Sequence, residues 1–149
     1  MNRIAPYLER EDILLDVDVA SAAELFAAID RHMAARHGLP PDSVEGGLRR
    51  REQLASTGLG QGFAIPHCRV LKLDRVVAAY VRLRTPLPFA APDGLPVSEF
   101  LVLLVPKQAS DEHLEILADA ARLFSDQDFR ASLRRSGDAA LVQRYFTEA

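Results

Sequence analysis

The chain has 149 residues, of which 48% are hydrophobic and 26% charged, and its formal net charge is −3. This composition is ordinary for a globular protein, so residues 1–149 are expected to form a single domain with a buried core. Acidic residues lie beside the densest basic cluster, LRRREQ at 48–53, which argues against nucleic acid as the main partner. The longest apolar runs are too short to cross a bilayer, and the first residues lack the apolar region of a secretory signal. We therefore expect a cytoplasmic location without membrane insertion.

The N-terminal quarter of the chain predicts a strand followed by a helix. The run ILLDVDV at 13–19 is apolar and branched, which is typical of a short strand. Ser21, with Glu24 three residues later, matches a capping box, in which each side chain accepts a hydrogen bond from a free backbone N–H of the other residue. The apolar periodicity that follows predicts a helix to about Arg36, ended by Gly38.

A second helix is expected after the prolines at 40–41. Proline stops the preceding helix, and Asp42 or Ser43 is expected to cap the next one. Gly46 and Gly47 lie in its first turns, where they disfavour a helix because glycine loses much backbone freedom. The residues expected to face the core are Val44, Leu48 and Leu54.

Three further strands are predicted in the middle of the chain. The sequence GFAI at 62–65 indicates a short strand, and the apolar runs at 76–83 and 99–106 have the length of buried central strands. Between these two runs, TPLPFAAPDGLPV at 85–97 is rich in proline and is expected to be a loop, with a turn at its Asp-Gly pair.

The C-terminal part of the chain predicts helices. A cap at Ser110 or Asp111 is expected to begin a helix with one apolar face, and 128–135 and 138–146 predict one broken or two short terminal helices. Helices that alternate with short strands over one core indicate an α/β fold. The residues expected on the apolar face are Leu114, Leu117, Ala118, Ala121 and Phe124.

The stretch STGLGQGFAIPH at 56–67 has the composition of an anion-binding loop. Gly58, Gly60 and Gly62 remove side chains from the backbone, so its N–H groups are expected to approach a phosphate closely, and Thr57 either donates to that phosphate or satisfies the loop backbone. The pattern is not a Rossmann fingerprint, because the loop runs from a predicted helix into a predicted strand. It is not a P-loop, because no Gly-Lys-Ser/Thr sequence ends it.

His67 is expected to be held rigidly beside this loop. Pro66 has a restricted φ and also restricts the residue before it, so the imidazole is presented from a stiff backbone. An imidazole with a pKa of about 6.5 is largely neutral at cytoplasmic pH, and its free lone pair can attack phosphorus. The pattern suggests phosphorylation of His67 itself. Arg51 is a candidate cation for the phosphoryl oxygens, and His113 is a candidate second hydrogen-bond donor.

The segments REQLASTGLGQGFAIPHCR at 51–69, TPLPFAAPDGLPV and LVLLVPKQASDEHLEIL resemble enzyme IIA of the fructose/mannitol class of the bacterial phosphoenolpyruvate-dependent phosphotransferase system. The resemblance covers about residues 10–147. It implies that His67 is the phosphorylated histidine, that Arg51 contacts the phosphoryl group and that His113 is a second active-site histidine. It also implies one α/β domain with a mixed sheet flanked by helices, and a small histidine phosphocarrier protein as the phosphoryl donor, with no metal, nucleotide or other cofactor.

Within this family, the residue sequence of the glycine-rich motif and the free-standing single domain resemble the nitrogen-regulatory branch. That resemblance implies phosphorylation-dependent binding to regulatory or transport partners, such as potassium transporters and sensor kinases. Two alternatives remain. One is a sugar-specific IIA protein that passes the phosphoryl group to a IIB protein, and the other is an interaction module in which His67 is never phosphorylated.

The candidate residues also have simpler interpretations. His67 is alternatively a loop histidine with satisfied hydrogen bonds, and His113 is one bonded to a nearby carbonyl at its helix start. Arg51 alternatively pairs with Glu45 or Glu52 on a solvated helix face, a contact worth about 0–1 kcal/mol. These interpretations predict local structure and no chemistry.

The remaining histidines and the single cysteine are expected to be structural. His32 and His37 flank a helix end, where the helix dipole favours imidazolium. Cys68 stands where the family has glycine or another small residue, and it is expected to tune access to His67 or to add redox sensitivity. A thiol–imidazole pair of Cys68 with His67 or His113 is disfavoured because no orienting Asn or Asp is evident. No spacing of zinc ligands is present, so no metal site is predicted.

Overall fold

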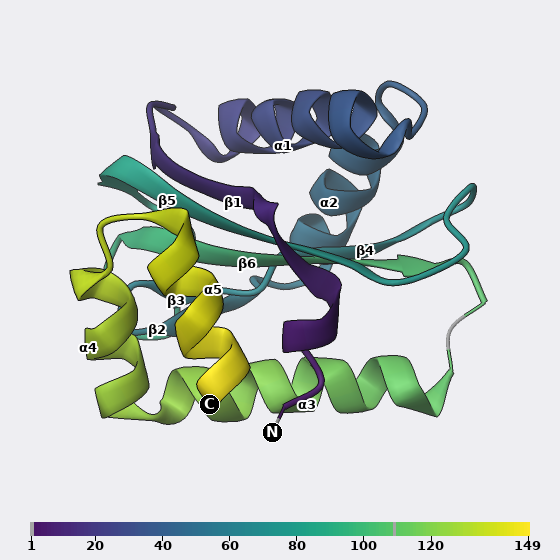
Figure 1. Ribbon diagram of the computed structural model, residues 1–149. Coiled ribbons are helices and arrows are strands. Elements are labelled where there is room, and N and C mark those ends of the chain that lie inside the picture. The colour runs from purple at the N-terminus through teal and green to yellow at the C-terminus, as the bar shows by residue number, and fades with distance from the viewer. Residues whose placement is uncertain (1, 109) are drawn as a thin grey trace.

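The computed structural model describes residues 2–108 and 110–149, and within them six strands form one mixed sheet (Figure 1). Its order is β1-β5-β6-β3-β2, with β4 also paired to β6. β1 pairs with β5, and β3 and β4 pair with β6, in parallel, whereas β5–β6 and β2–β3 are antiparallel. The strands are β1 (Leu8–Val17), β2 (Gly58–Gly60), β3 (Phe63–Ala64), β4 (His67–Val70), β5 (Val77–Leu87) and β6 (Val97–Pro106).

Helices cover both faces of this sheet (Figure 1). One face packs against α1 (Ala22–His37) and α2 (Ser43–Leu54), and the other packs against α3 (Asp111–Ser125), α4 (Gln127–Arg135) and α5 (Ala139–Glu148). The predicted α/β fold with a mixed sheet flanked by helices is confirmed, and the C-terminal segment forms two separate helices. In the part of the chain that the structure describes, no helix is long and apolar enough to cross a membrane.

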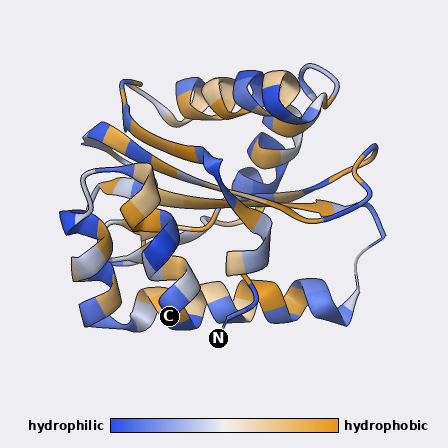
Figure 2. Cartoon of the chain, in the orientation of Figure 1, coloured by the Kyte–Doolittle hydropathy of each residue, from blue (hydrophilic) through white to orange (hydrophobic). Residues whose placement is uncertain are grey.

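The protein has two hydrophobic cores, one on each face of the sheet, and the side chains of the central strands point alternately into one and the other. In β5, Val77, Ala79 and Val81 pack towards α1 and α2, whereas Ala78 and Tyr80 pack towards the C-terminal helices. Successive side chains of a strand point to opposite faces, so a strand buried on both faces is apolar throughout. Figure 2 shows this as nearly continuous hydrophobic colour along β5 and β6 inside the sheet.

The strands differ from their predictions mainly at their ends. β1 begins at Leu8 rather than at residue 13, because it lies at an edge of the sheet, where the side chains of residues 9–11 reach solvent while Asp12 is buried. β5 continues to Leu87, into the segment predicted as a loop. The short strand predicted at 62–65 is only Phe63–Ala64, and β4 after it was not predicted. The predicted Asp-Gly turn is confirmed, with Gly94 at φ +72° and its N–H donating to the Ala91 carbonyl over 3.0 Å.

The first helix begins and ends at the predicted residues, although the Glu24 side chain accepts the Ala20 N–H in place of the Ser21 N–H of a capping box. The second helix is capped differently. The Ser21 hydroxyl accepts the Glu24 N–H, and Gly38 ends α1 in the left-handed conformation at φ +67°. At the start of α2, neither predicted cap makes a side-chain capping bond. The carboxylate of Asp30, on α1, accepts the backbone N–H groups instead, over 2.9–3.0 Å. The two carboxylate oxygens of Asp30 thus satisfy free N–H groups that the side chain of a local cap would otherwise satisfy. The donors are Asp42, Val44 and Glu45.

Four predicted core assignments were wrong: Ala118 and Ala121 of α3 are exposed, and so are two leucines that lie near the same place. In α2, Val44 and Leu48 are buried as predicted, but Leu54 is 83% exposed. In α3, Leu114 is 65% exposed. The buried side of α3 repeats every four residues from Ile116, so the predicted face was rotated relative to the real one. The residues buried on α3 are Ile116, Ala120 and Phe124, of which only Phe124 was predicted.

The two histidines at the end of α1 bind one buried carboxylate. Asp12 of β1 is completely buried, with His32 Nε2 2.7 Å from its Oδ1 and His37 Nε2 2.9 Å from its Oδ2. The predicted structural role of these histidines is therefore confirmed, although their partner is a side chain rather than the helix dipole alone. Burial raises the pKa of Asp12, but the hydrogen bonds and charge of His32 and His37 outweigh it, so the pKa lies below its ordinary 3.8.

We expect Asp12→Asn to lower the free energy of unfolding at neutral pH by about 1–3 kcal/mol, the cost of weakened bonds to a buried charged group. Because the folded pKa of Asp12 is depressed, its contribution is complete above the unfolded value and is lost as the pH falls through the folded value. The difference between the two proteins should therefore narrow in acid. Urea unfolding from about pH 7 to about pH 3 measures this, and a constant or widening difference would contradict it.

Candidate functional site

His67 lies at a break in the outer strand of the sheet. β3 and β4 both pair with β6, and the peptide between them is oriented by Pro66, whose carbonyl accepts the Leu103 N–H over 3.0 Å. Proline contributes no N–H, which suits a position at an open sheet edge. The His67 Nδ1 is 2.8 Å from the Ile65 carbonyl, so Nδ1 carries the proton and donates it. The lone pair of the neutral ring is therefore on Nε2.

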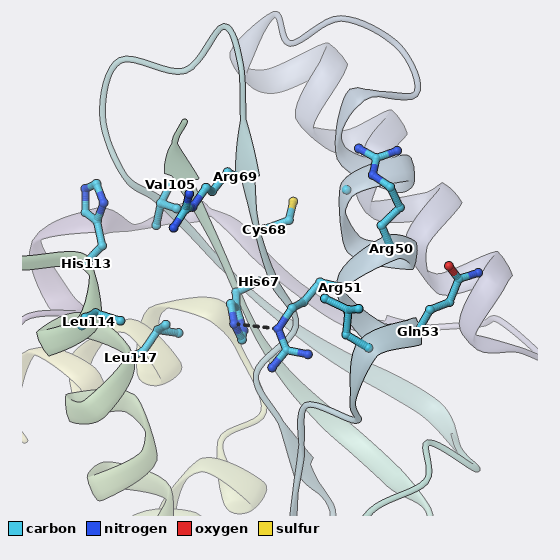
Figure 3. A pocket seen from close by; sticks show the side chains of 12 residues that line it. Arg50, Arg51, Gln53, His67, Cys68, Arg69, Val105, His113, Leu114 and Leu117 are labelled. Carbon is cyan, nitrogen blue, oxygen red and sulfur yellow. Dashed lines mark hydrogen bonds between the residues drawn. The ribbon is translucent and has the colours of Figure 1, made fainter. Parts of the chain in front are cut away.

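Arg51, close to the end of α2, faces that Nε2 atom (Figure 3). Its Nε donates to His67 Nε2 over 3.2 Å, and its Nη1 donates to the Ala55 carbonyl over 2.7 Å. The alternative pairing with Glu52 is not what the structure contains, because the Glu52 carboxylate accepts the Thr57 N–H at 2.8 Å and its hydroxyl at 2.7 Å. The guanidinium thus stands where a group bound to Nε2 would be.

The surroundings of His67 favour its neutral form. Burial lowers the pKa of His67 most, and the nearby Arg51 charge lowers it further. The Ile65 carbonyl and the Glu52 charge act in the opposite direction, but the pKa remains below its ordinary 6.5. A neutral imidazole at physiological pH is a nucleophile, whereas imidazolium has no free lone pair.

A cavity of about 840 Å³ opens beside His67, between α2, β4 and α3 (Figure 3). Arg50 and Arg69 bring two further guanidinium groups to it, and the exposed Leu54 and Leu114 give it an apolar rim. These leucines face the cavity, which explains why their predicted places in the core were wrong. The lining residues are Gly47, Arg50, Arg51, Gln53, Leu54, His67, Cys68, Arg69, Val105, His113, Leu114 and Leu117.

His113 lines the same cavity but does not contact His67. Its Nδ1 accepts the Ser110 N–H over 3.2 Å at the start of α3, so the proton of the neutral ring is on Nε2. The simpler interpretation predicted a bond from His113 to a carbonyl, but the partner of the ring is the backbone amide of Ser110. Figure 3 shows the ring on the α3 side of the cavity, pointing away from His67.

The glycine-rich segment is a hairpin next to the site rather than part of the cavity wall. Thr57 is buried and hydrogen-bonded to Glu52, and Gly58, Gly60 and Gly62 lie outside the lining. A Cβ atom on Gly60 would lie 3.2 Å from the Asp93 carboxylate, and one on Gly62 would lie 2.6 Å from the Arg134 guanidinium. Both glycines also have positive φ. Close packing of the hairpin therefore accounts for these two, and phosphoryl binding by the four residues remains a prediction.

A family model described as "Phosphoenolpyruvate-dependent sugar phosphotransferase system, EIIA 2" matches residues 6–149. The chain belongs to this family. An Escherichia coli relative named "Nitrogen regulatory protein" is 34% identical over 144 residues, which are 95% of this chain and 88% of the relative. Relatives of the same name from Bradyrhizobium diazoefficiens and Pseudomonas aeruginosa are 42% and 45% identical, each over 64% of this chain. In these two matches the chain spans 62% and 63% of the relatives' length.

Solved structures give the same assignment of this EIIA 2 chain. The crystal structure of nitrogen regulatory protein IIA-Ntr from Neisseria meningitidis superposes with a TM-score of 0.89 at 40% identity, covering 95% of this chain and 97% of that one. A solution structure of E. coli IIAMTL in complex with phosphorylated IIBMTL has a TM-score of 0.77 at 15% identity and covers 95% of this chain and 99% of that one. The second likeness concerns the fold alone.

Two cationic residues that line the cavity were missed from the sequence. Arg69 follows His67 by two positions on a strand, and side chains two apart share a face, so the strand period would have placed it beside His67. Arg50 belongs to the LRRREQ cluster, in which the sequence pointed to Arg51 alone as the candidate cation. No group of three or more His, Cys, Asp or Glu side chains within residues 2–108 and 110–149 is arranged to hold a metal ion.

We expect Arg51→Ala to raise the pKa of His67, because the substitution removes a charge that lowers it. Glu52→Gln should lower the pKa of His67, because it removes a charge that raises it. NMR titration of the histidine ring carbons measures both shifts in one experiment. An unchanged or lowered pKa of His67 in Arg51→Ala would show that Arg51 does not face His67 in solution.

Proposed function

We propose that this EIIA 2 chain is a regulatory phosphohistidine carrier of the cytoplasm, which accepts a phosphoryl group on His67 from a histidine phosphocarrier protein. The observation that supports this most is the orientation of the His67 ring. Its Nδ1–H is bonded to the Ile65 carbonyl, and its Nε2 lone pair faces the Arg51 guanidinium at the edge of an open cavity. A histidine held only for structure would need no cation at its unprotonated nitrogen.

The transfer step balances without a separate base. The Nε2 lone pair of His67 forms a bond to phosphorus while the N–P bond of the donor phosphohistidine breaks, and that electron pair returns to the donor imidazole. The His67 ring keeps its Nδ1 proton and gains positive charge, which the Ile65 carbonyl stabilises by accepting that proton's hydrogen bond. Both bonds are phosphoramidates, so the transfer is expected to be reversible.

Arg51 is proposed to neutralise the migrating group. Charge in the transition state spreads over the phosphoryl oxygens, and a guanidinium can bind two of them at once. Arg51 already points at the nitrogen that attacks, so it needs only to exchange Nε2 for phosphoryl oxygens. His113 has its Nε2 proton available, and donation to the docked phosphoryl group is its proposed part, together with the predicted roles of Thr57 and the hairpin glycines.

The regulatory role is proposed over sugar delivery because of the relatives. Chains named nitrogen regulatory protein are 34–45% identical to this one in the matches described above, whereas the mannitol-type IIA structure solved with its IIB partner is 15% identical. Phosphorylation adds negative charge to a cavity lined by arginines, which changes the partners that fit it. Potassium transporters and sensor kinases are candidate partners on the strength of the resemblance.

The deciding experiment incubates the chain with phosphoenolpyruvate, enzyme I and the histidine phosphocarrier protein of the same genome. We expect one added phosphoryl group by intact mass, stable in base and lost in acid, on the wild type and none on His67→Ala. His113→Ala is the matched control, because it removes another histidine of the same cavity and should still be labelled. An acid-labile phosphoryl group on His67→Ala would show that His67 is not the acceptor. No label on folded wild type would favour the interaction module.

Arg51→Ala should slow the transfer by about 10²-fold or more, the usual effect of losing one preorganised donor, with His67 still the acceptor. The measurement is the initial rate of mass increase at fixed donor concentration. An unchanged rate would remove Arg51 from the mechanism while leaving His67 in place.

A further inference from the structure

A close contact between α2 and β4 joins a residue without a side chain to a thiol. Gly47 and Cys68 are both buried, and a Cβ atom built on Gly47 would lie 2.8 Å from Cys68 Sγ and 3.2 Å from Cys68 Cβ. Real Cβ atoms essentially never approach another heavy atom within 3.0 Å. Helix α2 can therefore lie at this distance from β4 only because position 47 has no side chain.

This contact lies directly behind the two site residues. Gly47 precedes Arg51 by four positions, which is one turn on the same side of α2, and Cys68 directly follows His67 on β4. The Arg51 Nε to His67 Nε2 distance is 3.2 Å, at the long end of an N–H hydrogen bond. A displacement of α2 from β4 by a few tenths of an ångström would be enough to break it.

Cys68 is a buried thiol that fills space beside Gly47. Burial raises the pKa of the Cys68 thiol to about 12, although the nearby Arg50 charge lowers it, so little thiolate is present at physiological pH. The redox sensitivity expected from the sequence is therefore not supported, because oxidation and nucleophilic attack both proceed through the thiolate. The sulfur instead fills the space that Gly47 leaves open.

We propose that Gly47 and Cys68 are positioning residues, whose size complementarity sets the spacing of α2 and β4 and thereby holds Arg51 against Nε2 of His67. Neither residue touches the phosphoryl group. The combined volume of the two side chains matters, so a larger residue on one side is compensated by a smaller residue on the other. The kinetic part of this inference rests on the proposed function, whereas its structural part does not.

The test compares Gly47→Ala, Cys68→Gly and the double variant Gly47→Ala/Cys68→Gly. Alanine is otherwise favoured over glycine inside a helix, so damage by Gly47→Ala cannot come from helix propensity. We expect Gly47→Ala to raise the pKa of His67, as Arg51→Ala does, and to slow phosphoryl transfer about tenfold to 10²-fold. The double variant should return both quantities towards those of Cys68→Gly, which is the behaviour of coupled neighbours in a mutant cycle.

Gly46→Ala is the matched control. The three atoms nearest to its Cβ would all belong to the far end of the flexible Arg50 side chain, the first at 3.1 Å, so both readouts should stay near their wild-type values. If Gly47→Ala does not fold, Cys68→Val adds bulk from the opposite side and should produce the same two changes. A wild-type pKa and rate in Gly47→Ala, or a double variant as impaired as Gly47→Ala, would overturn the inference.

The two proposals fail in different ways. If the wild type is never phosphorylated, the proposed function fails, but the pKa of His67 across the variants still measures whether the contact positions Arg51. If the wild type is phosphorylated and Gly47→Ala matches it in rate and pKa, the proposed function stands and the positioning role is wrong.

Discussion

The break in the outer strand at Ile65 and Pro66 is the constraint on which the site depends. On either side of it, β3 and β4 pair in parallel with β6, so the backbone of His67 is fixed by the central sheet. At the break, the Ile65 carbonyl accepts the His67 Nδ1 proton. A neutral imidazole has one donor and one acceptor nitrogen, so this single bond determines that Nε2 carries the lone pair. Pro66 preserves the arrangement because its φ is restricted and it also restricts the backbone of Ile65.

The second half of the site depends on a helix that is held at its N-terminus and along the side that packs on β4. Asp30 of α1 satisfies the N-terminal amides of α2, and the helix then packs closely on β4, where Gly47 meets Cys68. Two glycines in a helix cost stability relative to alanine. Here that cost is offset by the packing, and the result is an arginine whose Nε reaches the unprotonated nitrogen of His67.

The cavity mouth combines two features that seldom occur together on an exposed surface. Leu54 and Leu114 present apolar side chains to solvent, whereas Arg50 and Arg69 add positive charge beside them. Exposed apolar side chains gathered at one place are typical of a surface that another molecule covers. Guanidinium groups next to them suit a phosphorylated partner, because they bind phosphoryl oxygens in pairs. The proposed docking and the proposed phosphoryl transfer therefore share one edge of the sheet.

The sequence by itself determined the α/β class, most helices and the buried strands β5 and β6, because these follow from local periodicity and capping. Its glycine-rich motif singled out His67, with Arg51 as a candidate cation beside it. Tertiary structure decided the rest. It placed Leu54 and Leu114 at a cavity instead of the core, let Asp30 rather than Asp42 cap α2, and made the glycines at 60 and 62 packing positions of a hairpin. Each outcome depends on a neighbour distant in sequence, and no local pattern records which neighbour occupies that space.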